Sequence, residues 1–428
     1  MEKWKKWIEG RELKLFSLAS VLVMVIAAFA LETPSGLAKG MKLIVVSRDA
    51  LITDYFELAG YGTALLNAAL VCGIGIFLIT VYQIPFTGLT MAALFINAGF
   101  GFWGKNPINI LPILFGTMLY ARVHKSRMSR YIYTALFGTC LAPLITELVF
   151  MLPFGRMMNL VAAVAVGIFI GFVLPPLSMH TASMHMGYSL FNVGFSAGVL
   201  AFAMVCVLRS FGMESDSVMI WKYGAEWEIA IGLYAYFILT LLLGIWMSGG
   251  KVKRLGRIMK HPGRAVTDFV LMDGIGATLM NMGILGIICE TYILLVGGDL
   301  SGPVVGSILA VFGFAAFGVH ARNYLPLLIG VYLSTFFTVY TPQSPGIQLA
   351  AIFAAGLAPI AGQFGVVAGV VAGFLNAVVV VCTKDMYGGL NLYNNGFGAG
   401  WVAIVMVPVA ESFMKQFKER KREETDEA

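Results

Sequence analysis

Apolar stretches of about 20 residues recur from one end of this chain to the other, and they limit its fold more than any other feature. A helix of that length crosses about 30 Å of hydrocarbon. Charged residues make up only 12% of the 428 positions, against roughly 25% in soluble domains. We therefore predict an all-α, polytopic membrane protein whose surroundings are the lipid bilayer.

About fourteen apolar segments are expected. They cover residues 14–31, 62–82, 87–103, 107–121, 131–152, 158–178, 189–210, 225–248, 275–297, 302–319, 323–339, 346–362, 364–382 and 389–411. Segments 87–103 and 107–121 are short and rich in Gly or Pro, which fits either two crossings or one re-entrant hairpin. Both alternatives leave the sidedness of the remaining segments unchanged.

Lys and Arg residues gather in four short regions, at 3–11, 122–130, 251–260 and 415–422. Basic loops of membrane proteins accumulate on the cytoplasmic side. A cytoplasmic N-terminus places all four regions inside, so we expect cytoplasmic termini in a cell (inner) membrane. The net charge of +6 then sets orientation and does not indicate a nucleic-acid partner. The five cysteines lie in or beside apolar segments, and their spacing suggests neither a disulfide framework nor a metal site.

The sequence repeats itself internally. Residues 187–198 (GYSLFNVGFSAG) match residues 389–400 (GLNLYNNGFGAG) at an offset of 202, and matches further upstream hold at an offset of 214. We predict a first membrane repeat at 14–210, an extracytoplasmic linker at 211–224, a second repeat at 225–411 and a charged cytoplasmic tail at 412–428. Each repeat holds an odd number of crossings, so the second should be inverted. Inverted repeats are a transporter and channel architecture, with a solute path near the midplane at the interface of the repeats.

Three pairs of asparagines occupy matching places in the two repeats, namely Asn67 and Asn281, Asn109 and Asn323, and Asn192 and Asn394. A buried amide costs free energy unless it is hydrogen-bonded. A polar solute passing through the protein would satisfy these amides, and bonds between helices would satisfy them equally well. Asn192 and Asn394 are the preferred candidates for the solute path.

Glu147 lies deep in segment 131–152, and the repeat places Gln363 at the matching position. Carboxylates inside a membrane commonly relay protons or bind ions. Glu147 is a candidate for ion coupling, Glu290 is a second, and a hydrogen-bonded structural role is the alternative for both.

For His185 a capping or interfacial role is preferred. The GxSxG pattern at 194–198 lacks the strand-to-helix turn of hydrolases, and the second repeat carries Gly398 where Ser196 stands. Catalysis is therefore not expected, and neither is a cofactor.

The stretch Gln83-Ile-Pro-Phe86-Thr-Gly88-Leu89, followed further on by Asn106-Pro107 and Phe115-Gly116-Thr117, resembles the repeat of the urea transporter family, although the Asn-Pro that follows the aromatic residue in that family is absent. The resemblance implies a urea-transporter-like core, a place for Gln83 and Phe86 along the solute path, and a homotrimer. The chain is more closely similar to a bacterial family of multi-pass membrane proteins of unknown function, from which no activity carries over.

These observations predict a transporter or channel for a small polar solute. A proton- or cation-coupled secondary transporter of a small organic solute is the first alternative. An intramembrane enzyme or a membrane subunit without transport activity is the alternative from another class. The sequence does not identify the solute, and it does not separate a channel from a coupled transporter.

Overall fold

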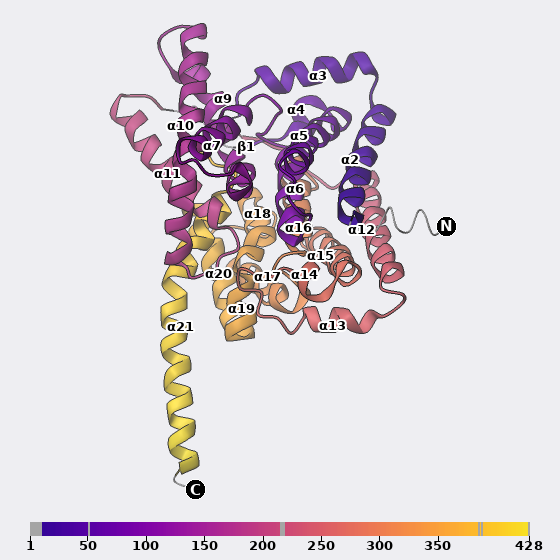
Figure 1. Ribbon diagram of the computed structural model, residues 1–428, viewed down its shortest axis with the longest axis vertical. Coiled ribbons are helices and arrows are strands. Elements are labelled where there is room, and N and C mark those ends of the chain that lie inside the picture. Colours follow the sequence, from indigo (N-terminus) through magenta and orange to yellow (C-terminus); the bar gives the residue numbers. More distant parts are fainter. Residues whose placement is uncertain (1–10, 50–51, 215–218, 384–385, 387, 427–428) are drawn as a thin grey trace.

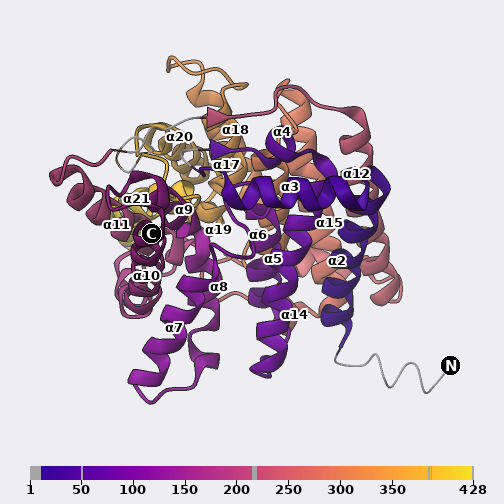
Figure 2. The same cartoon turned by 90° about the horizontal axis from the view of Figure 1, so that it is seen from above.

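The computed structural model describes residues 11–49, 52–214, 219–383, 386 and 388–426. Nearly all secondary structure in these residues is helical, and ten helical stretches are long and apolar enough to cross a membrane. The prediction of an all-α, polytopic membrane fold is confirmed. Figures 1 and 2 show the helices in two views at right angles.

The helices of the two halves follow each other in the same order. The first half contains α2 (Glu12–Leu31), α3 (Pro34–Val46), α4 (Tyr55–Ala59), α5 (Tyr61–Val81), α6 (Gly88–Phe100), α7 (Leu111–Val123), α8 (Ile132–Gly138), α9 (Ala142–Met151), α10 (Arg156–Met184) and α11 (Asn192–Ser210). The second half contains α12 (Trp227–Met247), α13 (Leu255–Ile258), α14 (Phe269–Asp273), α15 (Ile275–Leu295), α16 (Gly302–Phe314), α17 (Ala321–Ser334), α18 (Pro345–Phe353), α19 (Ala358–Phe364), α20 (Val366–Thr383) and α21 (Asn394–Asp426).

Four of the expected apolar segments form helices too short to cross a membrane. Helices α6, α7 and α16 have 13 residues each and α17 has 14, which gives about 20 Å at 1.5 Å per residue. They form two successive pairs, α6 with α7 and α16 with α17. The re-entrant alternative for segments 87–103 and 107–121 therefore stays a prediction, to which the short helices are suited.

Two other segments are interrupted near their centres. The turns η2 (Thr139–Leu141) and η4 (Ala354–Leu357) separate α8 from α9 and α18 from α19. Pro143 and Pro359 each stand in the first turn of the helix that follows, where proline is tolerated because its missing N–H would have no partner there. The interruption frees backbone carbonyls at matching places in the two halves.

Helices α3 and α13 lie across opposite ends of the bundle, α3 at the top of Figure 1 and α13 at the bottom. The sequence predicted neither of these two helices.

Strand β1 (Ile52–Thr53) follows α3 and pairs in parallel with β2 (Met219–Ile220), which belongs to the linker between the halves. Trp221 of the linker donates a hydrogen bond of 2.9 Å to Asp299 of the second half. The linker is thus held by both halves.

The two halves interlock through close contacts between helix backbones. Helix α6 packs along α16, and a β-carbon added to Gly99 would come within 2.1 Å of the Gly306 carbonyl oxygen. Helix α11 packs along α21, where Gly194 and Gly396 meet. Only glycine allows such close approach of helices.

Each half also caps a helix of the other half. The Asp54 carboxylate accepts hydrogen bonds from Phe56 N of its own half and from Gly302 N at the start of α16. In the second half, Asp268 accepts from Val270 N and from Gly88 N at the start of α6. N-terminal N–H groups of a helix have no partner within the helix, so α6 and α16 each depend on the opposite half.

Candidate functional site between the two halves

A cavity of about 370 Å³, which we call the wide cavity, lies between the two halves. It borders Ala265 and Val266, in the loop between α13 and α14. Its other described lining residues are Leu89, Tyr133, Thr134, Phe137, Ala182, His185, Met186, Gly187, Ser189, Leu190, Phe191, Asn192, Val193, Phe314, Phe317 and Tyr393. Both halves contribute to its wall.

A second cavity of about 60 Å³, the narrow cavity, borders β1. Its described lining residues are Ile52, Trp103, Gly346, Leu349, Val380, Val381, Gly389, Asn391, Leu392, Asn394 and Asn395. Several of these match residues of the wide cavity at the repeat offsets, for example Asn391 with Ser189 and Trp103 with Phe317. The narrow cavity borders β1, which follows α3, and the wide cavity borders the loop at Val266, which follows α13. Helices α3 and α13 lie at the top and the bottom of Figure 1.

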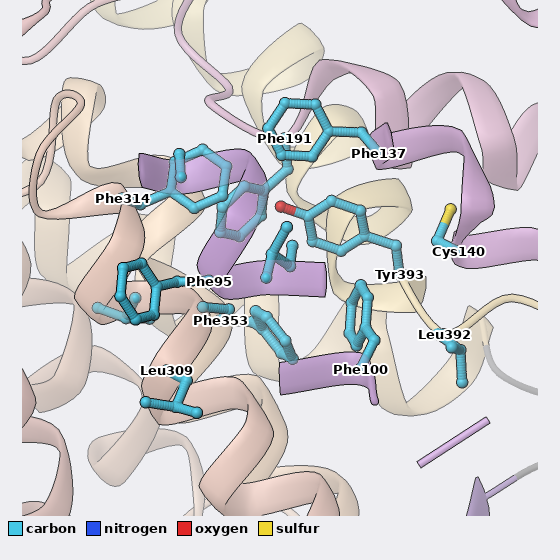
Figure 3. Close-up of a cluster of buried hydrophobic side chains, with 14 of the residues drawn as sticks. Phe95, Phe100, Phe137, Cys140, Phe191, Leu309, Phe314, Phe353, Leu392 and Tyr393 are labelled. Carbon is cyan, nitrogen blue, oxygen red and sulfur yellow. The ribbon is translucent and has the colours of Figure 1, made fainter. Parts of the chain in front are cut away.

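Six buried aromatic rings lie between the two cavities and form what we call the ring cluster (Figure 3). The members are three matched pairs, Phe100 with Phe314, Phe137 with Phe353, and Phe191 with Tyr393. The centroid of the Phe191 ring lies 4.8 Å from that of Tyr393 and 4.9 Å from that of Phe314. Such separations are typical of packed aromatic pairs, so the cluster closes the space between the cavities.

Five buried polar atoms that have no hydrogen-bond partner in the described part of the chain belong to residues that line the two cavities. The Ser189 Oγ and the Tyr393 hydroxyl belong to the wide cavity. The Trp103 Nε1, Asn391 Nδ2 and Asn395 Oδ1 belong to the narrow one. Figure 3 shows the Tyr393 hydroxyl pointing toward Phe191 and Phe314. Unpaired buried groups are costly, which suggests that water or a solute pairs with them.

Asn192 and Asn394 line the wide and the narrow cavity, respectively, as expected for path residues. Their amides are nevertheless engaged at the helix ends. Asn192 Nδ2 donates to the Ser178 carbonyl at 2.8 Å and its Oδ1 accepts from Thr181 at 3.0 Å. Asn394 makes the matching bonds to Val380 and Thr383 at 2.9 Å. Both asparagines therefore shape the cavity walls and secure the preceding helix.

The other asparagine pairs hold backbone and do not line either cavity. Asn109 Nδ2 donates to the Gly104 carbonyl at 3.0 Å, and Asn323 Nδ2 donates to the Gly318 carbonyl at 2.9 Å. Asn67 and Asn281 each donate to two carbonyls at the ends of α6 and α16, at 2.6–2.7 Å. Of the two roles left open by the sequence, the structure gives these four asparagines the structural one.

Glu147 is fully buried and forms an ion pair with Arg48, which follows α3 and is about one-third exposed. Next to this pair, Asp49 accepts a hydrogen bond of 2.9 Å from the Tyr55 hydroxyl. Burial raises the pKa of Asp49 to about 7, although its hydrogen bonds act in the opposite direction. The result is a polar cluster beside α3 that belongs to the first half alone.

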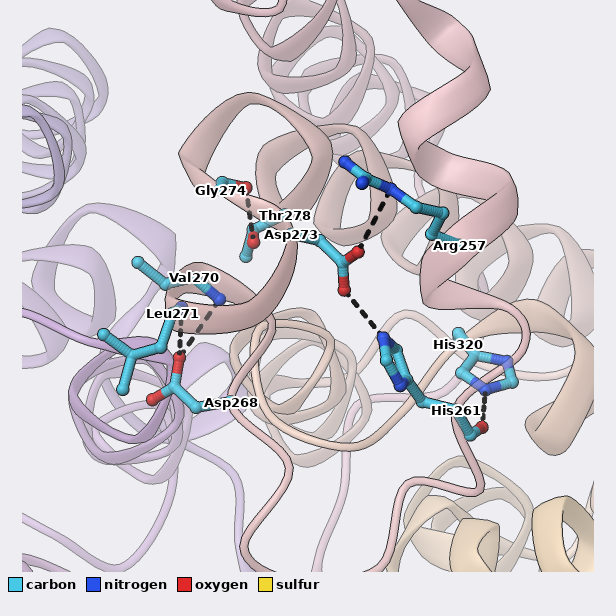
Figure 4. A network of polar contacts seen from close by, with 9 residues as sticks. All are labelled: Arg257, His261, Asp268, Val270, Leu271, Asp273, Gly274, Thr278 and His320. Atoms are coloured by element: carbon cyan, nitrogen blue, oxygen red, sulfur yellow. Dashed lines mark hydrogen bonds and ion pairs between the residues drawn. The ribbon is translucent and has the colours of Figure 1, made fainter.

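The second half has a different arrangement at the matching place. Gln363 is exposed, and the neighbouring Gly362 packs on the backbone of Pro262. The nearby polar groups are those of Asp273, His261 and Arg257 (Figure 4). Asp273 pairs with His261 at 2.9 Å and with Arg257 at 3.6 Å. Gln363 thus has no part in a buried coupling site with Glu147.

Glu290 is fully buried in α15, and neither carboxylate oxygen has a hydrogen-bond partner in the described residues. It is not among the described residues that line the two cavities. Gln83 is exposed, with a positive φ of 53°, in the loop before α6. Neither Gln83 nor the partly buried Phe86 lines a cavity. The structure therefore places these three sequence candidates outside the described lining of both cavities.

Several residues of the site were missed at the level of sequence. The exchanged caps Asp54 and Asp268 repeat at the offset of 214, so an alignment of the two halves that included acidic residues would have paired them. Lys105 is fully buried near the ring cluster, and in the sequence it looked like one more loop lysine. The second repeat carries the apolar Val319 at the position that matches Lys105. This difference between the repeats was the signal available in the sequence.

Comparison with known protein families bears on the identity of the chain. One family model matches residues 33–210 and 248–412, which together cover most of the chain. The chain belongs to the DUF1576 family. Its description is "protein of unknown function", so the prediction of a family without an assigned activity is confirmed. Each matched stretch of this DUF1576 protein begins after the first helix of one half, α2 or α12.

No curated protein and no solved structure matches the chain. The resemblance to urea transporters and the assignment to a bacterial membrane therefore stay predictions. For this DUF1576 member, the geometry of the two cavities and the ring cluster carries the functional argument.

Proposed function

We propose that this protein is a transporter or channel for a small solute, which passes between the two halves through the wide cavity, the ring cluster and the narrow cavity. One observation supports the proposal most strongly. Two cavities whose walls share matched residues border loops that follow α3 and α13, and four of the six packed rings line the wide cavity. Inverted repeats with a site at their interface are a recurrent transporter architecture.

The lining of the cavities restricts the solute. None of the described residues that line them carries an acidic or basic side chain other than His185, and burial lowers the pKa of His185, which keeps the ring neutral near pH 7. The described part of the walls thus offers no carboxylate to a cation. The proton- or cation-coupled alternative has less support, since Glu147 is paired with Arg48.

Transport is also favoured over catalysis. The Ser196 side chain is fully buried, and its hydroxyl donates to the Asn192 carbonyl at 2.9 Å. A nucleophile needs access to its substrate and a general base within reach. Serine hydrolysis at this residue is therefore not proposed. A homotrimer, as the resemblance to urea transporters implies, is a separate proposal that the molar mass of the purified protein would test.

The basic loops orient the proposed path. Residues 122–130 and 251–260 fall on the cytoplasmic side by the positive-inside rule. The wide cavity borders the loop that follows 251–260, so it faces the cytoplasm, and the narrow cavity faces the opposite side. In this state the ring cluster closes the path, and passage requires the rings of Phe191 and Tyr393 to separate.

Solute flux into proteoliposomes tests the proposal. Phe191→Ala removes one ring from the centre of the cluster and should raise the rate of passive flux of small polar solutes several-fold over wild type. Phe237→Leu is the matched control because its ring is equally buried but packs between α12 and α15, away from the cluster. Absence of flux for the wild type and for Phe191→Ala, with both folded, would contradict the proposal.

A further inference from the structure

Lys105 is fully buried at the turn between α6 and α7. Its Nζ donates a hydrogen bond of 3.0 Å to Asn97 Oδ1 and lies 4.9 Å above the centre of the Phe100 ring. Both contacts favour a positive charge, since an amide oxygen and the face of an aromatic ring carry negative potential. The backbone N–H of Lys105 is held at the C-terminal end of α6 by the Phe100 carbonyl, where the helix dipole also favours a cation.

The neighbours of Lys105 hold the acceptor in one orientation. Asn97 Nδ2 donates to the carbonyls of Ala93 and Leu136, at 2.8 and 3.1 Å. With both N–H groups of the amide used, Oδ1 must face Lys105. The Thr139 hydroxyl lies 3.1 Å from the same oxygen. This site is therefore arranged for the lysine rather than occupied by it incidentally.

The compensating negative charge is missing. In the described part of the chain, the contacts of Lys105 Nζ are the Asn97 amide and the Phe100 ring, and no carboxylate lies within ion-pair distance. Burial lowers the pKa of Lys105 to about 7, because an ammonium group out of water is strongly disfavoured unless an anion pairs with it. An anion bound beside Lys105 would therefore favour its charged form. Two of its three N–H donors are also left for another acceptor.

The second half does not repeat this arrangement. Val311, Val319 and Ala355 stand where the first half has Asn97, Lys105 and Thr139. The matched structure around them is closely kept, because Asn67 and Asn281 bond the carbonyls of Lys105 and Val319 in the same way at 2.7 Å. The fold thus tolerates an apolar residue at this place, and the lysine is an addition to it.

Lys105 adjoins both the narrow cavity and the ring cluster. Trp103 and Leu392 line the narrow cavity, and Leu392 packs so closely on Gly104 that an added β-carbon would lie 2.5 Å away. Phe100, under the Lys105 Nζ, belongs to the ring cluster and lies 5.5 Å from the Tyr393 ring. Movement of Leu392 or Phe100 would open the lysine to the path.

We propose that Lys105 binds a small monovalent anion, inorganic or carboxylate, on its way between the two halves. This inference rests on the proposed transport function and gives it a substrate class. The anion supplies the negative charge and accepts the remaining N–H donors of the lysine, while the described lining residues of both cavities carry no Asp, Glu, Lys or Arg side chain that would compete with Lys105.

Thermal unfolding of the purified full-length protein tests the binding step without any flux. The buffer holds HEPES as its only anion, and chloride, nitrate, formate, acetate or lactate is added up to about 100 mM, since a ligand of the folded state raises the unfolding midpoint. We expect one anion or one group, inorganic or carboxylate, to raise the midpoint of the wild type by several degrees. Lys105→Met should abolish this shift, and Lys105→Arg should keep part of it. Lys222→Met removes a lysine from the surface pair with Glu226 and should leave the shift unchanged.

Lys105→Met is expected to fold, because an apolar residue fills the matching place in the second half. Even if it does not fold, the wild type alone tests the proposal. The same unfolding midpoint with each added anion as without any would overturn it. An unchanged shift in a folded Lys105→Met variant would overturn it as well.

Flux measurements separate the proposed anion site from the proposed transport function. Anion-specific stabilisation without flux of any solute contradicts transport alone, whereas flux that Lys105→Met leaves anion-selective contradicts the role of Lys105 alone.

Discussion

At the scale of single residues, buried charges in this protein are compensated in different ways. Glu147 has Arg48 as a direct partner, Asp54 and Asp268 accept N–H bonds from helix ends, and Lys105 has an amide and an aromatic ring. The first three arrangements are complete within the chain. The arrangement at Lys105 leaves N–H donors without an acceptor in the described residues, and its place beside the narrow cavity and the ring cluster is why we propose it as a binding residue.

Removal of the Glu147 carboxylate should destabilise the protein. Loss of one partner from a buried ion pair typically costs about 3–5 kcal/mol, and the partial exposure of Arg48 reduces the expected cost to about 1–3 kcal/mol. Glu147→Ala should lower the thermal midpoint in detergent accordingly. Gln363→Ala is the matched control, since this residue is exposed at the equivalent place, and its midpoint should equal that of the wild type. Equal midpoints for both variants would contradict the structural role of the ion pair.

Asp49 should make stability depend on pH. Its pKa is raised from 3.8 to about 7 in the folded chain, so its contribution to stability is full below pH 3.8 and is lost as pH rises through 7. The loss is on the order of 4 kcal/mol at about 1.4 kcal/mol per pKa unit. Asp49→Asn removes this titration. The excess of the variant's thermal midpoint over that of the wild type should therefore grow from pH 5 to pH 8.

The control for Asp49 is Glu57→Gln, which changes an exposed carboxylate. Its curve of midpoint against pH should run parallel to that of the wild type between pH 5 and pH 8. A parallel curve for Asp49→Asn too would show that the Asp49 carboxyl titrates normally, in contradiction to its burial.

At the scale of helices, the sequence predicts most crossings closely and the short elements poorly. Segment 62–82 corresponds to Tyr61–Val81, and 275–297 corresponds to Ile275–Leu295, because long apolar runs in a membrane have no alternative to a helix. Helices α3 and α13 were missed, since short helices across the ends of the bundle lack a continuous apolar run. The ring cluster could not be derived, because the packing of six rings depends on how the halves interlock.

The Asp268 cap links two helices from different halves, and its loss should affect both. Asp268→Ala leaves the N–H groups of Gly88 and Val270 without their acceptor. Loss of a capping side chain costs about 0.5–2 kcal/mol, and the burial of this cap places the expected cost near 2 kcal/mol. Asp268→Asn retains an acceptor and should lose about half as much. The thermal midpoints of the variants measure these losses. A midpoint of Asp268→Ala equal to that of the wild type would contradict the shared cap.

At the scale of the whole molecule, the two halves are expected to have opposite orientations in the membrane. Ser35 of α3 and Gly256 of α13 are exposed and lie on helices at opposite ends of the bundle (Figure 1). Single cysteines at these places, in a background without the exposed Cys206 and Cys382, should differ in their reaction with a membrane-impermeant maleimide. In intact cells the cysteine at 35 should react, and the cysteine at 256 should react only after the membrane is opened. Reaction of both in intact cells would contradict the inverted arrangement.

The exchanged caps have a consequence for the synthesis of the protein. While the first half emerges from the ribosome, the N–H groups of Gly88 and Leu89 at the start of α6 lack their acceptor, because Asp268 is not yet translated. The close partner of Gly99 on α16 is also still to come. The nascent first half therefore enters the bilayer with its central hairpin unfinished, and it reaches its final shape only when the second half arrives to complete it.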